Sequence, residues 1–294
     1  MKKKTLGNKI FDLFNAMLMI LVSFIFLLPF IHIIFSSISD PSLLAQNRGL
    51  ILWPKGINFN GYALVFKNPN IIAGFFNSIF YVAVGTTLNI LFTAIIAYVL
   101  SRRNLLWKNT ILFMIVLTMI FTRSLIPFYL LVKGMGLRNT RWALLLPDLV
   151  IVWNFLIMRT AFADTPYELE EAATIDGANH LRIFFNIIIP VSKAVIAVNI
   201  LFYAVFHWNS WFNAMIFLNK RQLFPLQLIL REILILNDTS SMANAENVAY
   251  ENVNYYKVLV QYATIIVATA PILMIYPLIQ KHFAKGVMIG SLKG

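Results

Sequence analysis

Arg123 interrupts a long apolar stretch of this sequence, where a polar side chain must be paired or face a polar path. It lies within Met119–Pro127, and an unpaired charge in the middle of a membrane span costs at least about 2.5 kcal/mol. Two roles are open for it. It is either a cation that faces a pore or gate, or a partner of another helix, for which Asp148 is the nearby acid.

A second set of residues combines side-chain amides with aromatic rings. Such a set suits a sugar, because flat rings pack on its C–H faces and amides bind its hydroxyls. The candidate substrate-path residues, besides Arg123, are Asn154, Asn199, Tyr203, His207, Trp208, Asn209, Trp211 and Asn213. The alternative for each of them is structural, since Trp and Tyr also form interfacial belts and Asn also links helices.

Other kinds of chemistry find no support in the sequence. The chain has no cysteine, and its four histidines stand far apart, so it offers no disulfide framework and no metal-ligand spacing. It also lacks a GxxxxGK[ST] phosphate loop, so we expect it to bind no cofactor and to hydrolyse no ATP. The net charge of +12 is explained by basic residues that flank apolar runs and contact lipid head groups, not by nucleic acid.

The composition predicts an all-α membrane protein. Hydrophobic residues make up 60% of the 294 residues and charged residues 12%, whereas soluble domains have about 45–50% and about 25%. Six segments have roughly the 20 apolar residues that a spanning helix needs. They are Asn15–Phe35, Ser78–Leu100, Thr110–Val132, Trp142–Phe162, Ile189–Phe206 and Val258–Ile279.

Lys and Arg in short loops indicate the orientation of these spans. Their density near the N-terminus favours cytoplasmic termini, although the two sides carry twelve and ten basic residues. We therefore expect a cytoplasmic N-terminus (1–14), a transmembrane domain (15–280) whose first span is not cleaved, and a cytoplasmic tail (281–294). Of the outer loops, we expect Ser36–Asn77 to be irregular and Leu226–Leu236 to form an interfacial helix.

The loop between the fourth and fifth spans (163–188) predicts a short helix, a glycine turn and a second helix. Thr165 and Glu168 have the spacing of a capping box, and Pro166 suits the first helical position. The first turns are acidic, which the helix dipole favours. Gly177 can adopt the positive φ that ends a helix, and a second helix is expected to start near Asn179.

This loop resembles the EAA motif of ABC-importer permeases, EAA-x3-G-x9-I-x-L-P. The matching residues are Glu171, Ala172, Ala173, Gly177, Ile187, Ile189 and Pro190, with Ile189 in place of the usual Leu. The resemblance implies that the helix docks, on the cytoplasmic side, into a cleft of a separate ATPase subunit. The coupling residues that it implies in this loop are Glu170, Glu171, Ala172, Ala173, Asp176 and Gly177.

Further matches are similar to the maltose-type carbohydrate permeases. They include Asn77-Ser78, Ala97-Tyr98 with Arg102, and His207–Trp211. The end of the chain resembles the permease tail that reaches between the two ATPases, which adds Gly286, Gly290 and Lys293 to the implied coupling residues. The polar run Asn237–Asn254 and the KGVMIGSLKG ending look most like the LplC/YtcP-type branch, linked to complex or acidic oligosaccharides.

The resemblance implies a permease subunit of a bacterial sugar importer in the cytoplasmic membrane. Its partners would be a second homologous permease, two ATPase subunits that use ATP and Mg²⁺, and an external solute-binding protein. That protein would land on the outer loops Ser36–Asn77 and Asn219–Lys257. The alternatives are a stand-alone ion-coupled transporter, for which coupling acids and inverted repeats are missing, and a membrane-embedded enzyme, for which no catalytic constellation is found.

Overall fold

The computed structural model describes residues 6–47, 49–121, 123–235 and 257–274. These residues form helices and no β-strand, in agreement with the predicted all-α class. They divide into two compact units. One contains the chain up to Pro69 together with Ile233–Thr269, and the other contains Asn70–Glu232 and the last described residues from Ala270.

The first unit is built from α1 (Leu6–Ser37), α2 (Pro41–Gln46), α3 (Asn60–Lys67) and most of the helix Lys257–Met274. Leu44, Ile51 and Leu259 form its core. His32 links these parts: its Nδ1 accepts a hydrogen bond from the Ile51 N–H at 3.0 Å, so its Nε2 carries the proton and donates to the Tyr262 hydroxyl at 3.2 Å. The apolar window of α1 buries none of its residues.

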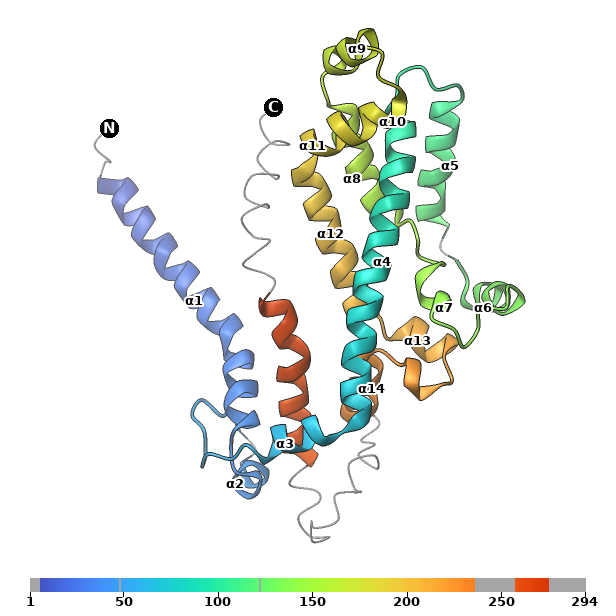
Figure 1. The fold of residues 1–294 in the computed structure, drawn as a ribbon. Helices are drawn as coiled ribbons and strands as arrows, with labels where there is room; N and C mark the ends of the chain where they lie inside the picture. Colours follow the sequence, from blue (N-terminus) through green and yellow to red (C-terminus); the bar gives the residue numbers. More distant parts are fainter. Residues whose placement is uncertain (1–5, 48, 122, 236–256, 275–294) are drawn as a thin grey trace. The chain divides into compact units, whose positions relative to one another are not determined.

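The second unit is organised along α4 (Pro69–Ser101), with α9 (Tyr167–Ile175) and α10 (His180–Ile183) beside one end of it and α14 (Leu226–Leu234) beside the other (Figure 1). Buried polar residues of α4, among them Asn77, Asn89 and Thr93, face the other helices of this unit. Those helices are α5 (Lys108–Ile120), α6 (Leu125–Gly134), α7 (Trp142–Leu145), α8 (Val152–Ala163), α9 (Tyr167–Ile175), α10 (His180–Ile183), the π-helix Phe184–Ile188, α11 (Ile189–Val191), α12 (Lys193–Trp208), α13 (Phe212–Phe217), the 3-10 turn Arg221–Leu223 and α14 (Leu226–Leu234).

In the described part of the chain, three continuous helices are long and apolar enough to cross a membrane: Gly7–Ser37, Pro69–Ser101 and Lys257–Met274. They contain the predicted first and second spans and the described part of the sixth. Two bent helix pairs raise the number of candidate crossings to as many as five. The prediction of membrane helices is therefore confirmed, whereas the count of six stays a prediction.

The predicted third, fourth and fifth spans are not single helices. The third is broken between α5 and α6, which meet at 116°, and the fifth begins only at Lys193, after a bend of 83°. The fourth loses its helix over 146–151, between α7 and α8. A proline lies in or beside each break (Pro127, Pro147 and Pro190), where its missing N–H and its ring disfavour a continuous helix.

Side chains of neighbouring helices bind the non-helical backbone of the break at 146–151. Asn89 of α4 donates through Nδ2 to the carbonyls of Asp148 (2.8 Å) and Leu149 (2.7 Å). The hydroxyl of Tyr203 on α12 accepts the N–H of Ile151 at 3.2 Å. Non-helical backbone at membrane depth is tolerated only where such partners surround it, so these contacts make the interruption compatible with a crossing.

Two expectations about the outer loops are wrong. Ser36–Asn77 is not irregular, because it contains α2, α3 and the first turns of α4. Of the stretch predicted as an interfacial helix, Leu226–Leu234 does form a helix, α14, but its apolar face is buried inside the protein instead of lying at an interface. Gly74 explains the difference: a Cβ there would lie 2.4 Å from Ile229 Cδ1, so the glycine leaves room for α14 against α4.

Candidate functional site

The helix, glycine turn and second helix predicted for the loop at 163–188 are present. Helix α9 spans Tyr167–Ile175 and carries Glu168 and Glu170 in its first turn. Gly177 has φ +78°, its N–H bonds to the Thr174 carbonyl, and the N–H of Ala178 bonds to the Ala173 carbonyl. These two bonds are those of a Schellman motif, which explains why α9 ends here.

The predicted start of α9 is wrong in detail. Pro166 occupies the N-cap position, with φ −54° and ψ 128°, instead of the first helical position, and no side chain caps the helix. Thr165 is buried, and its hydroxyl has no hydrogen-bond partner among the described residues, so the capping box with Glu168 does not form. A residue before proline is disfavoured in the α region, which keeps Thr165 outside the helix.

The chain after the glycine turn leads into the membrane segment through a widened helix. The side chain of Asn179 caps α10 by accepting the N–H of Arg182 at 2.8 Å, as the expected start near Asn179 requires. A π-helix follows at Phe184–Ile188, immediately before Ile189 and Pro190 of the motif. Proline removes one backbone donor and crowds the preceding turn, and a wider π turn relieves that crowding.

The inner face of α9 packs on the protein. Ala173 and Ala178 lie against a buried cluster that includes Tyr98, Phe162 and Phe184. The rings of Tyr98 and Phe184 are 5.0 Å apart, and the Tyr98 hydroxyl donates to the His180 carbonyl at 3.3 Å. The motif's second alanine, Ala173, therefore contacts the body of this chain.

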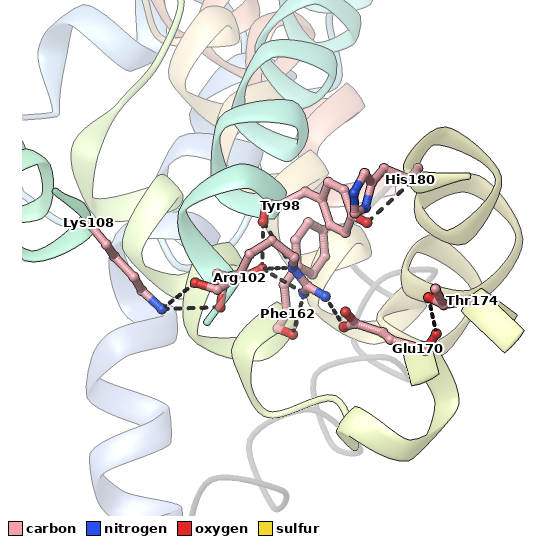
Figure 2. A network of polar contacts seen from close by, with 8 residues as sticks. Tyr98, Arg102, Lys108, Phe162, Glu170, Thr174 and His180 are labelled. Atoms are coloured by element: carbon pink, nitrogen blue, oxygen red, sulfur yellow. Dashed lines mark hydrogen bonds and ion pairs between the residues drawn. The ribbon is translucent and has the colours of Figure 1, made fainter. Parts of the chain in front are cut away.

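Arg102, the first residue after α4, ties α9 to the ends of α4 and α8 (Figure 2). It is ion-paired with Glu170 and donates to the Phe162 carbonyl (3.3 Å) and the Ser101 hydroxyl (2.7 Å). Its guanidinium lies over the Tyr98 ring at 4.5 Å. Burial lowers the pKa of Arg102, yet a guanidinium stays charged in proteins, so the pair with Glu170 persists at neutral pH.

Two more cations, Arg103 and Lys108, lie near the Arg102–Glu170 pair. The Arg103 guanidinium lies 5.0 Å from the centre of the Tyr167 ring, at the first residue of α9. Lys108 Nζ donates to the carbonyls of Ser101 (3.3 Å) and Arg102 (2.8 Å), at the C-terminal end of α4 (Figure 2). Cations are favourable at the carbonyl end of a helix, so the inner face of α9 rests on a stabilised helix end.

The outer face of α9 is exposed. It consists of Glu168, Glu171, Ala172 and Ile175, at the i, i+3, i+4 and i+7 positions that share one side of a helix. Ile175 is 81% exposed although it is strongly apolar. The structure thus separates the implied coupling residues of α9 into two groups: Glu171 and Ala172 are exposed, whereas Glu170 and Ala173 contact the body of this chain.

The other implied coupling residues lie beside or beyond this helix. Asp176 and Gly177 are exposed at the turn. A hollow of about 200 Å³ follows, lined by Ala173, Asp176, Ala178, Arg182, Asn186 and Ile187. Gly286, Gly290 and Lys293 of the tail lie outside the described residues.

Arg123 lies at the break between α5 and α6, and its partner is Asp148. Their side chains form an ion pair of 2.8 Å, and the guanidinium lies 3.9 Å from the centre of the Phe128 ring. Asn213 donates to the second carboxylate oxygen of Asp148 at 2.9 Å. The Arg123 side chain is 50% exposed, against 13% for Asp148, so it is paired and still accessible.

The remaining substrate-path candidates divide by burial. Asn154, Asn199, Tyr203, His207 and Trp208 are buried, and two of them hold neighbouring segments. Tyr203 bonds Thr93 at 2.7 Å, and His207 Nε2 bonds Asn89 Oδ1 at 2.6 Å. Asn209 and Trp211 are exposed, and Trp211 lies under the Arg231 guanidinium. Asn89 and Thr93 were missed in the sequence, where Asn89 inside an apolar helix was the available signal.

Comparisons with known proteins agree on one family. The sequence model of the family "Binding-protein-dependent transport system inner membrane component" matches residues 89–289. Protein LplC of Bacillus subtilis (strain 168) is 39% identical over 99% of this chain and 97% of that protein. The polygalacturonan/rhamnogalacturonan transport system permease protein YtcP of the same organism is 36% identical over 98% and 99%. A crystal structure of a bacterial ABC transporter involved in the import of the acidic polysaccharide alginate matches with a TM-score of 0.86 and 29% identity, over 96% of this chain and 100% of that one.

Proposed function

Because the chain belongs to the family of inner-membrane components of binding-protein-dependent transport systems, we propose that it is one of two homologous permease subunits of an ATP-driven oligosaccharide importer. As a transport component it performs no catalysis of its own. Two separate ATPase subunits bind ATP and Mg²⁺, and an external solute-binding protein delivers the substrate. Two permeases then alternate between outward and inward access.

Helix α9 is the element that docks on an ATPase subunit in this proposal. The observation that carries it is the division of α9 into an exposed outer face, around Glu171, Ala172 and Ile175, and an inner face tied to Arg102 through Glu170. A helix that only lay at a membrane interface would not need a partly buried ion pair with the end of a spanning helix. The pair lets a movement of α9 reach the ends of α4 and α8.

Six crossings, with both termini in the cytoplasm, are part of the same proposal. The three continuous helices and the two bent pairs supply five of them, and the interrupted segment α7–α8 is the sixth. Its support is that Asn89 and Tyr203 satisfy the backbone at the interruption. The proposed inner side is the one that carries α9.

The proposed substrates are oligosaccharides, including complex or acidic ones. The named substrates of the relatives support this, since YtcP is a polygalacturonan/rhamnogalacturonan permease and the alginate transporter imports an acidic polysaccharide. Within this chain we propose Arg123 and Asn213 as path residues, because the exposed half of the Arg123 guanidinium can bind a hydroxyl or carboxylate while Asp148 holds the other side.

Transport by the purified assembly tests this function. The chain is reconstituted in vesicles with its partner permease and the ATPase subunits, and uptake of labelled oligogalacturonate is measured with the solute-binding protein outside. We expect uptake only with ATP inside the vesicle. Uptake driven by an ion gradient without ATP, by this chain alone, would instead establish the stand-alone secondary transporter.

A further inference from the structure

Two loops at the far end of the second unit from α9 are joined by one asparagine. The N–H of Asn139 donates to the Phe217 carbonyl at 2.8 Å, and its Oδ1 accepts the N–H groups of Asn219 (3.1 Å) and Lys220 (2.9 Å). Asn139 has φ +63°, in the left-handed region that most side chains avoid. Asparagine adopts this region more readily than most other residues, and three hydrogen bonds hold it there, which makes this junction well defined.

Side chains from the N-terminal half of α4 bind the same junction. Asn77 Nδ2 donates to the carbonyls of Gln222 (2.7 Å) and Phe224 (3.1 Å), and the Tyr81 hydroxyl donates to the Leu223 carbonyl at 2.8 Å. Arg141 in turn donates to Asn77 Oδ1 at 3.3 Å. Three consecutive carbonyls are thus bound by side chains of one long helix, so the loop has little freedom to move.

Four exposed cations lie on these joined loops. We call this surface the basic platform, and it consists of Arg138, Arg141, Lys220 and Arg221, all of them exposed. Arg141 also lies over the Phe80 ring, and Arg221 is paired with Glu232 at 3.0 Å. Arg138 and Lys220 have no ion-pair partner among the described residues, so the platform presents uncompensated positive charge.

The platform lies on the opposite side of the membrane from α9. Asn77 and Ser101 are 24 residues apart on one helix, which is about 36 Å at 1.5 Å per residue and exceeds the roughly 30 Å of the hydrocarbon core. This placement rests on the proposed function, in which α9 is cytoplasmic. Lys and Arg are usually enriched in the cytoplasmic loops of membrane proteins. Cations clustered on the outer side therefore need a separate explanation.

We propose that the basic platform binds an acidic face of the solute-binding protein. The partner must carry negative charge, because charge of opposite sign attracts and orients two proteins as they meet. A rigid surface favours a partner of fixed shape over mobile lipid head groups. Anionic lipids also attract basic segments mainly at the cytoplasmic leaflet. The surface includes 138–141, outside the two outer loops at which docking is otherwise expected.

Charge reversal with a matched control tests this proposal. The whole transporter is reconstituted in lipid nanodiscs with the solute-binding protein that stimulates its ATP hydrolysis, and the concentration of that protein for half-maximal stimulation is measured. Arg138→Glu with Lys220→Glu is expected to raise it about tenfold or more and to leave the maximal rate unchanged. Arg138→Lys with Lys220→Arg, which keeps both charges, is expected to change it less than about twofold.

Salt and lipid composition provide the deciding controls. Higher ionic strength is expected to weaken the response of the parent transporter more than that of the reversed variant, because screening removes only an attraction that exists. An unchanged half-maximal concentration in the reversed variant would overturn the proposal. So would an effect that disappears in discs of neutral phosphatidylcholine, since the platform would then bind lipid. ATPase subunits missing from the preparation would contradict the proposed function instead.

Discussion

The Arg102 guanidinium, just beyond α4, is ion-paired with the Glu170 carboxylate on the inner face of α9, and both side chains are less than one-fifth exposed. Neighbouring glutamates of α9 therefore have different surroundings. Glu170 faces the protein, whereas its neighbour Glu171 faces outward. In the proposed function, this pair is the connection through which a movement of α9 reaches α4.

Removal of either partner of this pair should separate docking from transport. Arg102→Ala or Glu170→Ala leaves a partly buried charge unpaired, at a cost of about 2 kcal/mol, and lets α9 move independently of α4. We expect the ATPase to co-purify at parent levels and ATP-driven uptake to fall about tenfold. The double variant should lose no more uptake than either single one, because the two share one interaction. Additive losses would contradict the role of the pair.

Substitutions of Gly177 test the turn that ends α9. No atom lies within 4 Å of the position a Cβ would take, so any cost of Gly177→Ala comes from its φ of +78° alone, about 1–2 kcal/mol. Gly177→Pro, whose φ is fixed near −65°, should abolish ATPase co-purification and leave membrane insertion intact. Gly134→Ala is the control, since Gly134 also has no neighbour within 4 Å and no positive φ. Equal stability loss in both alanine variants, measured by thermal unfolding, would refute this explanation.

Gly85 leaves space for the ring of His207. A Cβ at Gly85 would lie 2.4 Å from His207 Nε2, and Asn89 holds that ring in place by a bond of 2.6 Å. Gly85→Ala should therefore lower the free energy of unfolding by about 1–3 kcal/mol. Combining it with His207→Ala removes the clash, so the double variant should be more stable than the sum of the single effects predicts. Strict additivity in thermal unfolding would argue against this contact.

Arg123 and Asp148 should behave as a compensating pair. Asp148→Asn leaves the guanidinium of Arg123 without its 2.8 Å partner, and an unpaired charge in a spanning segment costs about 2.5 kcal/mol. Arg123→Gln together with Asp148→Asn removes both charges and should restore most of the lost expression and stability. If the double variant is less stable than each single one, the ion pair is not what holds the break together.

Local signals predicted α9 and its turn, because a helix end depends on a few adjacent residues. The Schellman bonds of Gly177 and the cap at Asn179 follow directly from residue types. The start of α9 was predicted wrongly because Thr165 turns its hydroxyl into a buried position, where tertiary packing decides.

The breaks in the third, fourth and fifth spans were missed because hydropathy measures apolar content and not backbone continuity. Pro127, Pro147 and Pro190 were the available signals. Their effect depends on partners from distant helices, such as Asn89, which binds the carbonyls at 148 and 149. The roles of Glu170 and Ala173 likewise required knowing that Arg102 and Tyr98 lie beneath α9.

Co-purification of the ATPase subunit with outer-face variants of α9 tests the central claim most directly. Ala172 is exposed, so Ala172→Trp should fold normally and block docking, and Glu171→Lys should do the same by reversing a charge. Ala163→Trp, at another exposed alanine just before α9, is the matched control. We expect the ATPase to be lost from both outer-face variants and kept in the control. Parent levels of ATPase in all three would contradict the claim that α9 is the docking element.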